Sequence, residues 1–129
     1  MVGYCGMGTQ FTVIASQRLV VLTFDGTTSV EDLESTGAAI LSHPDFDPSF
    51  SQIIDCTKLT KISFSADTIR ELTRSEKTFN PTSTRVIVAP QAHIYGLARM
   101  AQAFATRTLP NLVVVRTMAE ALEALSKAK

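Results

Sequence analysis

Runs of apolar residues, separated by segments with helical spacing, organise most of the chain. Leu19–Leu22 is apolar at every position, which is typical of a strand buried on both faces. Phe11–Ala15 alternates weakly, and only a tight connection around Gln17-Arg18 separates it from the apolar run. Because so short a link cannot cross over a sheet, the two segments predict an antiparallel hairpin.

Three later apolar runs predict three more strands. They are Ile53–Ile54, which is expected to end at Asp55, Val86–Ala89 and Leu112–Val115. Segments with helical spacing separate these runs, so right-handed crossovers and parallel pairing are expected for them. One strand of the hairpin then lies antiparallel to its neighbours, and the predicted sheet is mixed.

Four segments with apolar residues at helical spacing predict four helices. Three of them begin at a hydroxyl residue that can cap the first turn, namely Ser29, Ser65 and Thr117. Asp32 and Glu120 lie three positions after the first and the last of these, as in a capping box. The third helix is predicted for about residues 92–106.

These elements follow the order β-β-α-β-α-β-α-β-α in a chain of 129 residues, long enough for one core. We therefore expect a single α/β domain over residues 9–129, with a mixed five-stranded sheet covered by four helices. Residues 1–8 hold three glycines and little that can pack, so they predict a flexible tail. Asp25-Gly26 predicts a turn after the hairpin.

The composition gives no support for nucleic-acid binding, membrane binding or a disulfide-linked fold. The 12 basic and 12 acidic residues cancel, which gives no electrostatic footprint for nucleic acid or an anionic membrane. Two cysteines, Cys5 and Cys56, are too few for a disulfide framework, and Cys56 is expected to be a small buried apolar residue. Without a signal peptide or a membrane-spanning run, a cytoplasmic location is expected. No cofactor, metal or catalytic motif is present, so we expect a non-enzymatic protein.

Ligands of parallel sheets usually bind beyond the carboxyl ends of the strands. The candidate residues at that edge are Asp55, Thr57, Gln91, His93, Arg116 and Thr117. Asp55 is also expected to cap the following loop. A hydrolase would need Cys56 and His93 within hydrogen-bond reach of each other.

Three further groups of residues have both a structural and a functional interpretation. His43, Asp45 and Asp47 resemble metal ligands, but the flanking prolines favour a turn. Gly96, together with Arg99 on the third helix, indicates either close packing on the sheet or the contact of a homodimer. Four phenylalanines in or near connections either cover the core or wall a ligand pocket, and these are Phe46, Phe50, Phe64 and Phe79.

The order of elements resembles the STAS domain of anti-sigma-factor antagonists and sulfate-transporter tails. More closely, the chain resembles the SpoIIAA-like family of small bacterial proteins. The stretches that carry this resemblance lie between about Phe11 and Leu125. They are Arg18-Leu19-Val20-Val21, Pro44-Asp45-Phe46-Asp47-Pro48, Ile54-Asp55, Tyr95-Gly96-Leu97-Ala98-Arg99-Met100 and Glu120-Ala121-Leu122.

In anti-sigma antagonists a serine that opens the second helix is phosphorylated by a partner kinase. The resemblance implies such a phospho-switch at Ser65, with Ser63 as the alternative, although Asp67 follows the serine where the family has an acidic residue before it. It implies a regulatory module that binds a protein partner, such as an anti-sigma-type kinase. The alternative function is a carrier or sensor of a small apolar or anionic ligand, bound at the carboxyl edge of the parallel strands.

Overall fold

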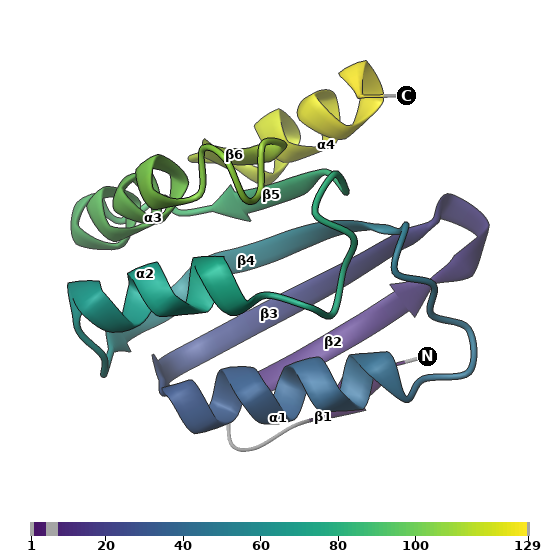
Figure 1. Cartoon of the computed structure of the whole chain (residues 1–129), viewed down its shortest axis with the longest axis horizontal. Helices are drawn as coiled ribbons and strands as arrows, with labels where there is room; N and C mark the ends of the chain where they lie inside the picture. Colours follow the sequence, from purple (N-terminus) through teal and green to yellow (C-terminus); the bar gives the residue numbers. More distant parts are fainter. Residues whose placement is uncertain (1, 5–7, 129) are drawn as a thin grey trace.

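The computed structural model describes residues 2–4 and 8–128, which form helices packed on a mixed β-sheet (Figure 1). Within these residues the strands are β1 (Val2–Tyr4), β2 (Thr9–Ile14), β3 (Leu19–Thr28), β4 (Ser51–Ile62), β5 (Arg85–Val88) and β6 (Leu112–Val115). The α-helices are α1 (Val30–Leu41), α2 (Ala66–Ser75), α3 (Ala92–Phe104) and α4 (Met118–Lys127). A short 3-10 helix, Ala15–Gln17, joins β2 to β3.

The predicted fold class is confirmed. The strands lie in the sheet in chain order, with β2 antiparallel to β3 and with parallel pairing from β3 to β6. The five expected strands and four helices occur in the expected order. Each crossover steps in the same direction along the sheet, and right-handed crossovers then put α1, α2 and α3 on one face. The last helix, α4, packs on the opposite face.

The described part of the N-terminal segment is not a tail. Val2–Tyr4 forms β1, an edge strand that pairs antiparallel with β2 and precedes the five expected strands. The rest of the predicted tail up to residue 7, including Cys5, lies outside the described residues. Gly8 has a φ of 81°, and a Cβ atom on it would lie 2.3 Å from the carbonyl oxygen of Asp25. Only glycine permits this approach of two backbones.

Both central strands are longer than their sequence pattern indicated. The predicted turn at Asp25-Gly26 is wrong, because β3 continues through it to Thr28. The predicted end of β4 at Asp55 is also wrong, since the strand continues to Ile62. The pairing of β3 with β4 shifts register twice, and each shift inserts an extra residue in β4. The Asp55 carboxylate accepts hydrogen bonds from the amide (3.0 Å) and hydroxyl (2.6 Å) of Thr57, so the expected local cap bends the strand without ending it.

The predicted helix starts are confirmed. Ser29 with Asp32 and Thr117 with Glu120 form complete capping boxes. The Ser65 hydroxyl caps α2 by accepting a hydrogen bond from the Thr68 amide at 3.3 Å. None of the helices within residues 8–128 has the length and apolar character that crossing a membrane requires.

The core is divided between the two faces of the sheet. On the α4 face, strand residues such as Ile53, Val86 and Val88 are at most 1% exposed and pack against Ala121 and Leu125 of the helix. On the α1–α3 face, alternate strand residues pack against the three crossover helices, as Val20 and Leu22 do with Ile40 and Ile94. This second face contains the candidate site.

Candidate functional site

A cavity of about 510 Å³ lies between the sheet and the helices on the α1–α3 face. Its floor is formed by β3, β4 and β5, and α1 and α2 form its two sides. It extends along the strands from Gln52 and Arg85, at the start of β4 and β5, to Thr28 and Ile62, at the ends of β3 and β4. Its size is within the range of about 300–1,000 Å³ that is usual for small-molecule sites.

The cavity exists because α1 and α2 are fixed to different parts of the domain. The Arg70 side chain of α2 lies over the Phe104 ring of α3, 4.5 Å from the ring centroid. At the other side, His43 follows α1 and meets the Phe11 ring of β2 edge-on at 6.3 Å between centroids. The two helices run roughly parallel to each other over the sheet, with space between their ribbons (Figure 1).

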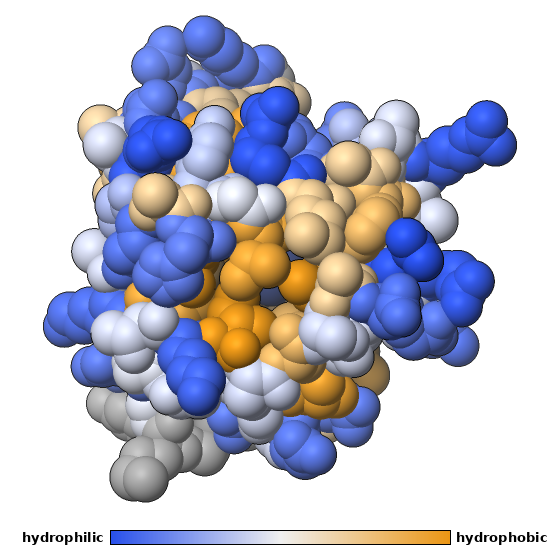
Figure 2. Space-filling model, turned by 90° about the vertical axis from the view of Figure 1, so that its left-hand side faces the viewer, coloured by the Kyte–Doolittle hydropathy of each residue, from blue (hydrophilic) through white to orange (hydrophobic). Residues whose placement is uncertain are grey.

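The bulges in β4 shape the floor. Because two extra residues are inserted, Cys56, Leu59 and Ile62 recur every third position and all three line the cavity. Phe64 extends this apolar wall beyond the strand. Figure 2 shows the end of the molecule at which the parallel strands terminate, where apolar side chains surround a hollow and hydrophilic residues lie around them. The opening is therefore lined mostly by apolar side chains.

Two polar atoms in the cavity wall lack hydrogen-bond partners among the described residues. The hydroxyl of Thr28 and the Nε of Arg85 are buried and unpartnered. The Gln52 side chain, on a residue 7% exposed, also lines the cavity. Gln52 and Arg85 are neighbours in the register of β4 and β5, whereas Thr28 lies at the other end of the cavity.

Arg85 is the charged group most deeply buried in this wall, at 2% exposure. Its Nη2 donates to Glu76 at 3.3 Å and to the Phe79 carbonyl at 3.2 Å, and its Nη1 donates to two further carbonyls at 3.4 Å. Burial lowers the pKa of Arg85, and the Glu76 carboxylate opposes that shift. The guanidinium stays charged, and Glu76 compensates its charge.

The Cys56 thiol faces the same space but is not activated. Burial, and to a smaller extent the Asp55 carboxylate, raises the pKa of Cys56 to about 12. His93 is exposed, and its Nε2 lies 3.0 Å from the carbonyl oxygen of Thr60. No hydrogen bond joins the thiol to that imidazole within the described residues. The expectation of a small buried apolar residue at Cys56 is confirmed.

The residues predicted at the carboxyl edge mostly make structural contacts within the domain, as hydrogen bonds, a cation–π contact and a helix cap. The Gln91 amide donates to the carbonyls of Thr57 (2.6 Å) and Leu59 (3.1 Å), which ties the extended end of β4 to the start of α3. The Arg116 guanidinium lies 4.0 Å from the centroid of the Tyr95 ring, and Thr117 caps α4. Of the six candidates, none lines the cavity.

Ser63 and Ser65 flank Phe64 at the approach to α2 and are exposed. The Ser63 hydroxyl donates to the Thr28 carbonyl at 3.0 Å, so it anchors this connection to the end of β3. The Ser65 hydroxyl caps α2, as expected. Both therefore have structural contacts, and Ser65 keeps an accessible oxygen at the start of a helix that forms one side of the cavity.

Gly96 and Arg99 lie on the exposed side of α3. A Cβ atom added to Gly96 would meet no atom within 4 Å. The interpretation of Gly96 as a close packing contact with the sheet is therefore wrong. A homodimer contact through Gly96 and Arg99 stays a prediction.

The predicted turn at His43-Pro44 to Ser49 is confirmed. The His43 Nδ1 accepts from the Asp45 amide at 3.1 Å, and Asp47 accepts from the Ser49 amide at 2.8 Å. Of the four phenylalanines, Phe64 and Phe79 line the cavity, and Phe46, Phe50 and Phe79 pack in the core. Phe79 therefore has both positions, between the cavity and the core.

The cavity residues that sequence analysis missed are Gln52, Glu76 and Arg85. Arg85 directly precedes an apolar run and looks like an exposed residue at the end of a strand. Comparison with family models, curated proteins and solved structures gives no match.

Proposed function

We propose that the protein binds a small, predominantly apolar molecule in the cavity between α1, α2 and the sheet, as a carrier or a sensor. The observation that supports this is a space of about 510 Å³ with mainly aliphatic and aromatic walls in a chain of 129 residues. Burying a ligand there would recover contacts that the side chains of the wall do not make with one another. This is the alternative function that the sequence raised, with the site beneath the helices and not at the polar edge.

Binding of a neutral apolar fluorophore tests this function. We expect N-phenyl-1-naphthylamine to fluoresce strongly with the protein at micromolar concentrations, because its emission rises in apolar surroundings. Ala98 lines the cavity, whereas Ala103 lies on the exposed side of the same helix. Ala98→Phe should weaken the binding of the fluorophore by at least tenfold, and Ala103→Phe should leave it unchanged. Equal binding by both variants, or none by the native protein, would refute the site.

Regulation through Ser65 is a second candidate function, favoured by the exposed hydroxyl at the start of α2. A phosphate there would add negative charge at a helix N-terminus and alter the surface that a partner protein meets. A kinase-like partner should bind the native chain and lose affinity for Ser65→Asp. If Ser65→Asp binds such a partner as well as the native chain does, the switch is excluded.

A further inference from the structure

The inner end of the cavity differs chemically from the rest of its wall. Gln52 and Arg85 lie side by side on β4 and β5, and both are at least nine-tenths buried. The Nε of Arg85 has no acceptor within the described residues. A buried donor without an acceptor is destabilising, so such groups usually have a partner.

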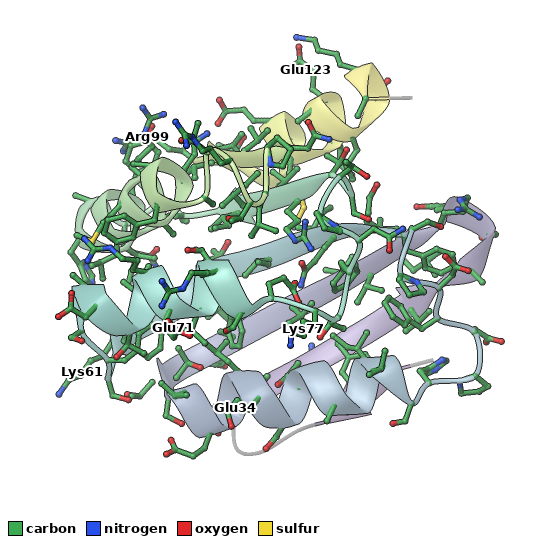
Figure 3. All side chains as sticks on the ribbon, viewed as in Figure 1. Glu34, Lys61, Glu71, Lys77, Arg99 and Glu123 are labelled. Atoms are coloured by element: carbon green, nitrogen blue, oxygen red, sulfur yellow. The ribbon has the colours of Figure 1, made fainter. Side chains whose placement is uncertain are left out.

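The charges around this end cancel. Glu76 accepts a hydrogen bond from Arg85 at 3.3 Å, and its other oxygen accepts one from the Thr78 amide at 2.6 Å. Nearer the solvent, Glu34 on α1 and Lys77 just after α2 are exposed, line the cavity and have opposite charges (Figure 3). A ligand anion would add a second negative charge beside Glu76, and a ligand cation would meet Arg85. Both arrangements are unfavourable where water is excluded.

We propose that Gln52 and Arg85 bind the uncharged polar end of a single-chain amphiphile, such as the hydroxyl of a long-chain alcohol or the carbonyl of a ketone. This inference rests on the proposed function and names the ligand class. The oxygen of the ligand accepts hydrogen bonds from the Gln52 amide and from the Arg85 Nε, and its chain lies along the floor formed by Ile54, Cys56 and Leu59. Polar groups that fix orientation in a mainly apolar pocket are the usual arrangement in small-molecule sites.

Competition against the bound fluorophore tests the proposal with three probes of equal chain length: 1-decanol, decanoate and decyltrimethylammonium. Gln52→Leu removes the amide but keeps the size and apolar character of the wall. We expect this variant to bind 1-decanol roughly tenfold more weakly, which is the effect of one lost hydrogen bond in a buried site. Its affinity for the fluorophore should not change. Gln10→Leu on β2, the same substitution at a glutamine that does not line this cavity, should change neither affinity. Decanoate and decyltrimethylammonium should compete more weakly than 1-decanol in the native protein.

A second measurement needs no variant. The infrared carbonyl stretch of bound 2-decanone, labelled with carbon-13 at the carbonyl, should lie at lower frequency than in hexane, since hydrogen bonds weaken that vibration. A frequency equal to that in hexane would overturn the proposal, as would equal affinity of 1-decanol for native protein and Gln52→Leu, or tighter binding of decanoate than of 1-decanol. In each of these cases the fluorophore still binds and the proposed function stands. If neither fluorophore nor alcohol binds, the proposed function itself fails.

Discussion

The two faces of the sheet show different ways of covering the same strands. On the α4 face, one helix lies directly on β4, β5 and β6, and the residues between them are almost fully enclosed. On the α1–α3 face, three helices cover the sheet and leave a cavity between themselves and the strands. Ile53 and Ile54 are consecutive residues of β4, yet the first is 1% exposed in the closed core and the second lines the cavity.

This difference suggests that one face of the sheet mainly stabilises the domain and the other mainly provides a binding surface. Close packing supplies stability, because every side chain in a dense core gains dispersion and transfer energy. A face with a cavity has fewer of these packing contacts, but the cavity provides a surface to which a ligand can bind. We therefore expect substitutions on the α4 face to act mainly on stability, and those on the α1–α3 face to act mainly on binding.

The largest expected effect is on the chemical reactivity of the thiol in the cavity wall. With a pKa raised to about 12, Cys56 should react with iodoacetamide at pH 8 roughly a thousandfold more slowly in the folded protein than in the unfolded chain. The measurement uses Cys5→Ser so that one thiol reports, and bound N-phenyl-1-naphthylamine should slow the reaction further. A rate within tenfold of that of the unfolded chain would contradict the burial of this thiol.

Truncation of the neighbouring residues Ile53 and Ile54 compares how strongly the two faces of β4 contribute to the free energy of unfolding. Ile53→Ala should lower the free energy of unfolding by about 3 kcal/mol, since it opens a void in a closed core. Ile54→Ala should cost only about 1 kcal/mol, because its side chain already borders the cavity and lacks contacts on that side. Urea denaturation measures both values. Equal losses would mean that the two faces are packed alike.

Enlarging an alanine tests the same contrast in the opposite direction. Ala121 of α4 is 0% exposed against the sheet, so Ala121→Leu should overpack the core and destabilise the fold by roughly 1–3 kcal/mol. Ala98→Leu adds the same atoms on the cavity side and should change stability by less than about 0.5 kcal/mol, because there is room for them. Thermal unfolding of both variants is the measurement, and a larger loss for Ala98→Leu would reverse the assignment of the faces.

The helix caps should have smaller effects on stability than the truncation of Ile53. Thr117→Ala on α4 and Ser65→Ala on α2 should each reduce stability by about 1 kcal/mol through the loss of a cap. On the cavity side we also expect faster hydrogen exchange in the first turn of α2 and faster entry of the fluorophore. Ser65→Asp retains an acceptor and serves as the control for the cap. If Ser65→Ala leaves both rates unchanged, the start of α2 takes no part in access to the cavity.

Local signals were sufficient to predict most of the fold. The hairpin followed from the short link before Leu19. The starts of α1 and α4 followed from hydroxyl caps with acidic residues three positions later, and the start of α2 followed from the hydroxyl of Ser65. The long ends of β3 and β4 were missed because two inserted residues replace the period of two with the spacing Cys56-Leu59-Ile62. In the sequence this segment looks like a polar loop. Only its pairing with β3 shows that it is a strand with two inserted residues.

The candidate site was predictable only in part. Sequence analysis raised a ligand site at the carboxyl edge of the parallel strands and named Phe46, Phe50, Phe64 and Phe79 as either wall or core residues, but it favoured polar residues at the strand ends. Those residues have local partners, as Gln91 has in Thr57. The cavity depends on how far apart α1 and α2 lie in space, and the burial of Arg85 depends on Glu76 across a turn. Neither property is encoded by a local pattern.

The cavity also makes the volume of the protein a functional variable. Unfolding eliminates internal space, so hydrostatic pressure favours the unfolded chain in proportion to the space that the native state encloses. Ligands that fill the space beneath α1 and α2 reduce this volume difference. The ligand-free protein should therefore unfold at lower pressure than the liganded protein. The difference depends on the volume that the ligand fills and not on the hydrogen bonds of its polar end.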